Sequence, residues 1–230
     1  MATIKSHIFY LLGYFFLGMA LTSCAQDNSS FYPSYKNYIV QPYALNSPHN
    51  LVLLNTYSYQ QTTNYTCGPA VVMSLMHYYG KLSTAEMNST TELRIAKEMG
   101  TTQWGTMQDK MVGWLENHGF SVQYGQRISL DMLLNNLKHR VPVIMVWNDW
   151  SGHSMLAIGY YKDDATDNSD KDVIFFADPS TSSYIVNNQK SIYGINTVTP
   201  KQLNLMWLNA QYFFNPTHTA VGMYIIAVPK

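Results

Sequence analysis

The hydrophobic and polar positions along the chain predict helices in the first half and strands in the second. Residues 70–76 are apolar at almost every position, which is typical of a helix that is buried on all sides, and Gly80 ends this segment. Periodic apolar residues predict three further helices, from Thr90 to Met99, from Thr106 to His118, and from an N-cap at Ser129 to about His139.

The strand pattern begins with a short apolar segment at Phe120 to Tyr124 and dominates from residue 141 onwards. Helices that precede most of the strands predict an α+β fold, because βαβ units would alternate. The later expected strands are Val141–Trp147, His153–Tyr161, Val173–Ala177 and Val221–Val228, with a short helix at Lys201–Leu208 before the last strand.

The first 23 residues have the features of an export signal. Lys5 is the only charged residue before Asp27, and it is followed by an apolar stretch over residues 7–21. This stretch is shorter than the ~20 residues that a membrane-spanning helix needs, and it suits a secretory signal peptide. We therefore expect a signal peptide at 1–23, a tether rich in Ser, Asn, Pro and Tyr at 24–50, and one domain at 51–230.

The end of this signal, Leu21-Thr22-Ser23-Cys24, resembles a bacterial lipobox. The resemblance implies cleavage before Cys24 and attachment of a diacylglyceryl group to its sulfur. Two or three acyl chains anchor a protein stably to a membrane. The expected location is therefore the cell envelope, on the periplasmic side of the outer membrane if the cell has two membranes. An ordinary secretory peptide with a chance cysteine is the alternative.

The composition narrows the classes of function. The chain has 230 residues with 14 basic and 14 acidic side chains, and its 12% of charged residues is about half the ~25% that is usual in soluble domains. This excludes a nucleic-acid binder built on a basic surface. Two cysteines exclude a disulfide-dense scaffold and a metal site with several thiolates. We expect no metal and no cofactor. The acidic run 163–172 lacks the central Gly and terminal Glu of a calcium loop, and it instead suits a solvated hairpin.

Cys67 is the candidate nucleophile. If Cys24 is lipidated, Cys67 has no disulfide partner, and a lone thiol in an exported protein is either buried and inert or kept for its reactivity. Cys67-Gly68-Pro69 is the expected start of the buried helix, so the sulfur of Cys67 would lie at the positive end of the helix dipole. That position favours the thiolate.

Three short motifs extend this hypothesis. They are Gln61 followed six residues later by Cys67-Gly68-Pro69-Ala70, Gly152-His153 at the start of an apolar strand, and Asp178-Pro179 at the end of the next strand. Together they resemble the papain-like cysteine peptidases, most closely the bacterial double-glycine leader peptidases, over about residues 57–180. The resemblance implies a papain-like fold with a buried N-terminal helix that carries Cys67, followed by an antiparallel sheet.

The resemblance also implies the roles of four residues. Cys67 would be the nucleophile, His153 its general base, Asp178 the group that orients the imidazole, and Gln61 an oxyanion donor. The implied function is a thiol hydrolase that acts on a peptide or protein. Acyl transfer at the same site and a non-catalytic peptide-binding envelope lipoprotein are the alternatives.

Each of these residues also has an ordinary structural reading. His153 could be a core histidine, and Asp178 could do no more than begin a turn. Gln60, next to Gln61, carries the same side-chain amide. His218 is a weaker candidate base. His77 lies ten residues along the same helix, about 15 Å from Cys67, and is too distant to serve as its base.

Overall fold

The structure is a computed structural model that describes residues 50–147, 152–163, 172–180, 185–186, 189–190, 194–207 and 222–230. The predicted signal peptide, Cys24 and all but the last residue of the predicted tether lie outside the described residues, as do His218 and most of the acidic run. Within the described ranges, no helix combines the length and the apolar character that a membrane crossing requires.

The helices begin and end within two residues of the predicted positions. Ser129 acts as the predicted N-cap, because its side chain accepts a hydrogen bond from the backbone N–H of Met132 at 3.1 Å. A short 3₁₀ helix, η2 (Thr84–Glu86), was not predicted. The α-helices are α1 (Cys67–Tyr78), α2 (Ser89–Glu98), α3 (Gln108–Asn117), α4 (Leu130–Lys138) and α5 (Pro200–Trp207).

The strands form a seven-stranded antiparallel sheet in the order β2-β9-β3-β4-β5-β8, with β1 paired to β4. The sequence did not predict β1 and β8, which have only three and four residues, too few to show a strand period of their own. A separate pair, β6 (Ile185–Val186) and β7 (Gln189–Lys190), was also not predicted. The strands of the main sheet are β1 (Leu51–Leu53), β2 (Phe120–Gly125), β3 (Val143–Trp147), β4 (His153–Tyr161), β5 (Val173–Ala177), β8 (Ile195–Val198) and β9 (Met223–Pro229).

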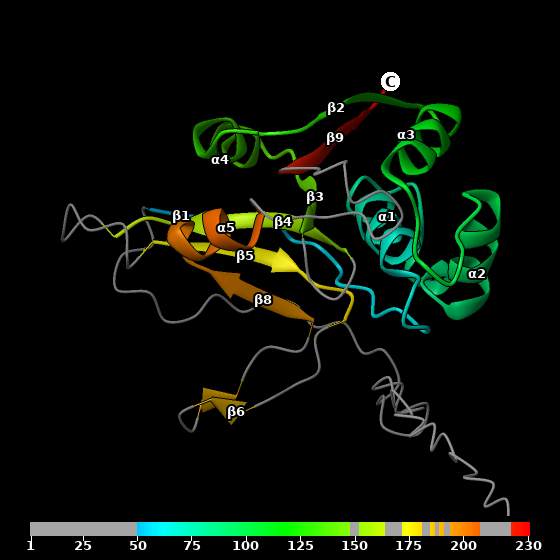
Figure 1. Ribbon diagram of the computed structural model, residues 1–230, viewed down its shortest axis with the longest axis horizontal. Helices are drawn as coiled ribbons and strands as arrows, with labels where there is room; N and C mark the ends of the chain where they lie inside the picture. The colour runs from blue at the N-terminus through cyan, green and yellow to red at the C-terminus, as the bar shows by residue number, and fades with distance from the viewer. Residues whose placement is uncertain are drawn as a thin grey trace, which may run out of the picture.

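The first three α-helices gather on one side of the molecule, and β4, β5 and β8 lie on the other (Figure 1). Helix α1 packs against both α2 and β4 and is therefore enclosed, as its continuous apolar sequence predicts. Helix α5 packs against β3 and β8. This arrangement of helices and an antiparallel sheet confirms the predicted α+β fold.

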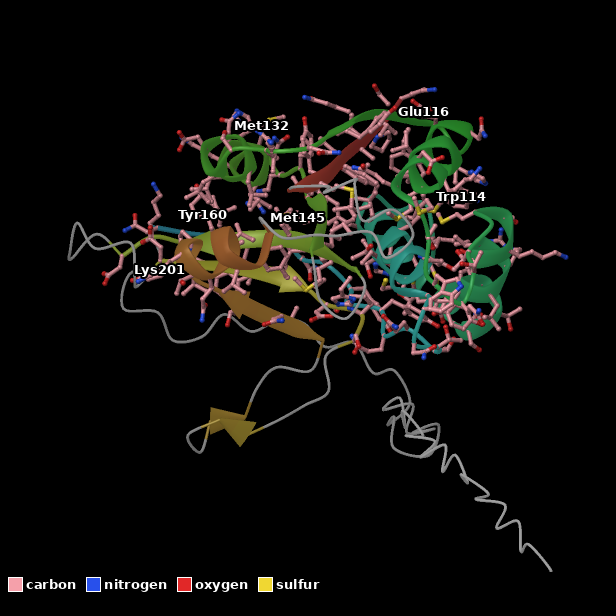
Figure 2. All side chains as sticks on the ribbon, viewed as in Figure 1. Trp114, Glu116, Met132, Met145, Tyr160 and Lys201 are labelled. Carbon is pink, nitrogen blue, oxygen red and sulfur yellow. The ribbon has the colours of Figure 1, made fainter. Side chains whose placement is uncertain are left out.

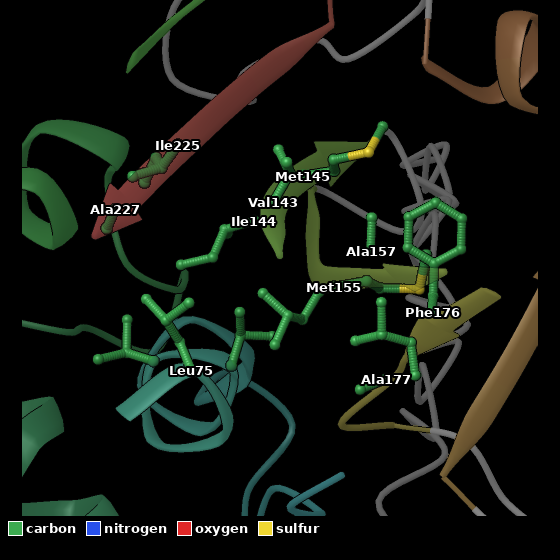
Figure 3. Packing of buried hydrophobic residues seen from close by; sticks show 14 of the residues in the cluster. Leu75, Val143, Ile144, Met145, Met155, Ala157, Phe176, Ala177, Ile225 and Ala227 are labelled. Atoms are coloured by element: carbon green, nitrogen blue, oxygen red, sulfur yellow. The ribbon is translucent and has the colours of Figure 1, made fainter. Parts of the chain in front are cut away.

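Alternate side chains of the central strands enter different parts of the core. Ile144 of β3 extends toward Leu75 of α1, whereas Met145, Ala157 and Phe176 lie together on the other side of the sheet (Figure 3). All five side chains are at most 1% exposed.

The side chains of the whole domain follow the same division between interior and surface. Figure 2 shows Met145 in the middle of the molecule, while Glu116 on α3 and Lys201 on α5 lie at its periphery. Because α1 is packed against the sheet from one side, the N-terminus of α1 is held close to the strand ends that carry the candidate site.

Candidate functional site

Cys67 is the first residue of α1 and is a free thiol with only 9% of its surface exposed. The following glycine allows a close approach between α1 and the segment before α3. A Cβ atom at Gly68 would lie 2.9 Å from both Cβ and Oγ1 of Thr106 and 3.1 Å from Sδ of Met111. The packing of α1 against this segment therefore requires a glycine after Cys67.

The sheet brings His153 and Asp178 together at adjoining ends of two neighbouring strands. His153 is the first residue of β4, and Asp178 directly follows Ala177, the last residue of β5. Since the two strands are antiparallel neighbours, with Leu156 paired to Ala177, the start of β4 meets the end of β5. The Nε2 atom of His153 donates a hydrogen bond to Oδ1 of Asp178 at 2.8 Å.

Asp178 is buried and held by several donors. Its Oδ1 also accepts from the backbone N–H of Ser180 at 2.9 Å, and its Oδ2 accepts from Nδ2 of Asn196 at 3.2 Å. Its own N–H donates to the carbonyl of Gly194 at 2.9 Å. Sequence reasoning missed Asn196, because this residue reaches the site from β8, a strand that the sequence did not predict.

Cys67 and His153 form a hydrogen-bonded pair in which each favours the charged form of the other. Burial opposes ionisation of Cys67, but the hydrogen bond and positive charge of His153 outweigh it and lower the pKa of the thiol from 9.0. Burial likewise opposes protonation of His153, but hydrogen bonds to Asp178 and Cys67 and their negative charges raise its pKa from 6.5 to about 10. The arrangement therefore favours a thiolate beside an imidazolium.

Ser154 is a second partner of Cys67 that the sequence analysis did not identify. Both its backbone N–H and its hydroxyl donate to the Cys67 sulfur and lower the pKa of the thiol. The strand pattern explains this contact, because Ser154 shares a face of β4 with Leu156, and Leu156 pairs with Ile144, which extends toward α1. The available sequence signal was a serine directly after the candidate histidine, at the start of an apolar strand.

The two adjacent glutamines have different partners. The buried Gln60 side chain donates from Nε2 to the backbone carbonyl of Asp178 at 2.8 Å. Gln61 donates from Nε2 to the carbonyl of Thr63 at 2.6 Å, and its backbone N–H donates to the carbonyl of Pro179 at 2.8 Å. Both residues therefore lie beside the Asp178–Pro179 turn, and the side chain of Gln60 holds the backbone of that turn.

His77 lies away from the candidate site, as the sequence predicts. His77 is near the far end of α1, where its Nε2 is 3.2 Å from Oγ1 of Thr84. The ends of the acidic run are joined, because the N–H of Asp163 donates to Oδ1 of Asp172 at 3.0 Å. Among the described residues, no group of three or more His, Cys, Asp or Glu side chains could hold a metal ion.

Comparison with known proteins supports the resemblance seen in the motifs. The model of the Peptidase_C39 like family matches residues 53–199, a segment that contains Gln61, Cys67, His153 and Asp178. No curated protein matches the chain significantly.

Two solved structures of low sequence identity, each with a TM-score of 0.50, share the fold. A double-glycine motif protease from an AMS/PCAT transporter, in complex with its leader peptide, has a TM-score of 0.50 at 14% identity, covering 77% of this chain and 94% of that one. A Bacillus anthracis protein described as a C39-like peptidase has a TM-score of 0.50 at 12% identity, covering 78% and 98%. The peptidase domain of Streptococcus ComA, a bifunctional ABC transporter of a quorum-sensing pathway, has a TM-score of 0.49 at 16% identity, covering 74% and 96%.

Proposed function

Since the chain belongs to the Peptidase_C39 like family, whose relatives are cysteine peptidases, we propose that it cleaves an amide bond of a peptide or protein through an acyl-enzyme. The observation that carries the proposal is the position of His153, which is hydrogen-bonded to Cys67 on one side and to Asp178 on the other. A thiol activated by an adjacent imidazole that a carboxylate orients is the arrangement that nucleophilic catalysis needs.

The first half of the proposed reaction forms the acyl-enzyme. The Cys67 thiolate adds to the carbonyl carbon of the scissile amide, and the carbonyl oxygen becomes an oxyanion. The side-chain amide of Gln61 and the backbone N–H of Cys67 stabilise this charge. The imidazolium of His153 then gives its proton to the amide nitrogen, the C–N bond breaks, and the amine leaves.

The second half restores the enzyme. Neutral His153 removes a proton from a water molecule, which attacks the thioester carbonyl. The thioester C–S bond breaks, the carboxylic acid leaves, and the thiolate–imidazolium pair is restored. Asp178 stays ionised throughout and fixes the imidazole ring through Nε2, so that the other ring nitrogen, Nδ1, remains for Cys67.

The similar transporter protease was solved with a leader peptide, which supports a peptide as the substrate class of this chain. The buried position of Cys67 is consistent with this, because an extended peptide backbone is thin enough to reach a residue that is only 9% exposed.

The proposal also includes a lipid anchor at Cys24, supported by the Leu21-Thr22-Ser23-Cys24 motif. Metabolic labelling with a fatty acid that carries an alkyne tests it. The wild-type chain should be labelled and partition with membranes, whereas Cys24→Ser should lose the label. Labelling that persists in this variant would exclude the anchor.

One experiment tests the catalytic pair directly. The full chain is treated with iodoacetamide between pH 5 and pH 9, and modification of Cys67 is followed by peptide mass spectrometry. Reactivity that is already high at pH 6, and that is lost there in His153→Ala, supports the ion pair. A Cys67 that stays unreactive until pH 8.5 or until the chain is denatured would refute the proposal.

A further inference from the structure

Glu92 is a buried carboxylate that the proposed reaction does not use. It lies on α2, and its residue surface is 0% exposed. The neighbouring residues of α2 explain the burial, because Glu92, Ile95 and Ala96 occupy the i, i+3 and i+4 positions that face the core. A carboxylate at a core position is costly unless hydrogen bonds replace its lost hydration.

In the described part of the chain, the donors to the Glu92 carboxylate come from one short segment, residues 59–62. Oε2 accepts from the hydroxyl of Tyr59 at 3.0 Å and from the hydroxyl of Thr62 at 2.7 Å. Both Oε1 and Oε2 lie within hydrogen-bond distance of the backbone N–H of Thr62, at 3.0 and 3.2 Å. Three donors therefore converge on one carboxylate.

The same segment carries the two glutamines of the candidate site between its anchors. Gln60 and Gln61 lie between Tyr59 and Thr62, the two residues that Glu92 holds. On the opposite side, Gln60 donates to Asp178 and Gln61 to Pro179, both at 2.8 Å. The segment is thus fixed between α2 and the turn that carries Asp178.

We propose that Glu92 is a positioning residue for the oxyanion site, holding residues 59–62 so that the side-chain amide of Gln61 stays in place for the oxyanion. This inference rests on the proposed function for its catalytic meaning. A carboxylate suits the task because it only accepts hydrogen bonds and has acceptor sites for all three donors at once. Without it, the N–H and the hydroxyl of Thr62 lose the acceptor that ties the segment to α2, and the segment can shift by the small distance that matters for an oxyanion donor.

Glu92→Leu and Glu92→Gln test the inference in the full chain, with the exposed Glu116 of α3, labelled in Figure 2, changed to Gln as the matched control. Glutamine keeps one acceptor and adds a donor that faces hydroxyls, so it should preserve part of the order. Hydrogen exchange of the amides in residues 59–62 should be about tenfold faster in Glu92→Leu, less accelerated in Glu92→Gln, and unchanged in Glu116→Gln. If Glu92→Leu does not fold, Glu92→Gln should still show faster exchange.

Two kinetic measurements separate positioning from general damage. Hydrolysis of a peptide substrate should lose about tenfold or more in kcat with little change in KM, because an oxyanion donor acts in the transition state. Alkylation of Cys67 by iodoacetamide should keep its rate, because substitution at an sp³ carbon forms no oxyanion. A wild-type chain that hydrolyses no peptide would refute the proposed function while hydrogen exchange still decides the positioning role. Unchanged exchange in both variants, or a kcat equal to that of Glu116→Gln, would overturn the inference.

Discussion

Asp178 accepts a hydrogen bond at 2.8 Å from Nε2 of His153, the residue whose imidazole also pairs with Cys67. The contact depends on the antiparallel pairing of β4 with β5, which places the first residue of one strand beside the residue that follows the other. The carboxylate is itself fixed by Ser180 and Asn196. The sheet therefore fixes the orientation of the His153 imidazole, whereas α1 fixes the position of the Cys67 sulfur.

Asp178→Asn should leave the fold intact and remove most of the activity. The amide keeps the size of the carboxylate but not its charge, so the pKa of His153 should fall and that of Cys67 should rise. We expect a loss of at least about 100-fold in kcat and a shift of Cys67 alkylation to higher pH. Peptide hydrolysis and alkylation measure the two effects. Asn196→Ser, which leaves the charge in place, is the milder control; equal losses in both variants would contradict the role of the charge.

The pH profile should be bell-shaped. On the acid side, kcat/KM should rise as Cys67 ionises, at a pH below the ordinary value of 9.0, because the pKa of the thiol is lowered. On the alkaline side it should fall near pH 10, where the imidazolium of His153, with its pKa raised to about 10, loses the proton that the leaving amine needs. Initial rates between pH 4 and pH 11 measure both limbs. An alkaline limb near pH 6.5 would mean that His153 has an ordinary pKa.

The two adjacent glutamines should differ in what their removal costs. Gln61→Ala should lower kcat by about 10²–10³-fold with little change in stability, because it removes a proposed oxyanion donor. Gln60→Ala should instead lower the free energy of unfolding by about 1–3 kcal/mol, because it leaves the buried carbonyl of Asp178 without its 2.8 Å donor. Urea unfolding and peptide hydrolysis of both variants give the comparison. The opposite distribution would assign the oxyanion role to Gln60.

Ser154→Ala should weaken the thiolate without removing the ion pair. It deletes the hydroxyl donor to Cys67 and keeps the backbone donor, so the pKa of the thiol should rise. The pH midpoint of Cys67 alkylation measures the shift. Ser121→Ala, at an exposed position of β2, is the control and should leave the midpoint unchanged. If the midpoint of Ser154→Ala does not move, the hydroxyl does not reach the sulfur in solution.

The sequence could predict those parts of the site that depend on local pattern. Cys67 at a helix start, His153 at a strand start and Asp178 after a strand each follow from the apolar segments beside them. Asn196 and Glu92 could not be predicted in the same way, because their partners are distant in sequence and are reached through pairing and helix packing that no local period reveals. Glu92 occupies a position where the helical period calls for an apolar residue, and that conflict with the pattern was the signal for it.

The same distinction applies to the fold. The long elements with strong periods appear within two residues of their predicted bounds, whereas β1 and β8 are short and stable only because β4 and β5 supply their partners. Residues 51–53 were placed in the domain without a predicted strand, and the pairing of Leu51 with Tyr161 makes them part of the sheet. Such edge strands are determined by tertiary contacts more than by their own propensity.

Gly68→Ala gives a test of the contact that holds the nucleophile in place. In a helix, alanine is normally favoured over glycine by about 1 kcal/mol, but here the new Cβ would lie 2.9 Å from Thr106. Thr106 cannot easily move, because its Oγ1 is 2.8 Å from Oγ1 of Thr101. We expect a net loss of about 1–3 kcal/mol in the free energy of unfolding, together with slower alkylation of Cys67 as α1 shifts.

Gly113→Ala on α3 is the matched control for this substitution. Nothing lies within 4 Å of its added Cβ, so the ordinary helix preference should dominate and stabilise the chain by about 0.5–1 kcal/mol. Urea unfolding of the two variants should therefore give shifts of opposite sign. A stabilised Gly68→Ala variant with unchanged alkylation of Cys67 would mean that α1 and the segment before α3 are not in close contact. The close contact would then not explain why a glycine follows Cys67.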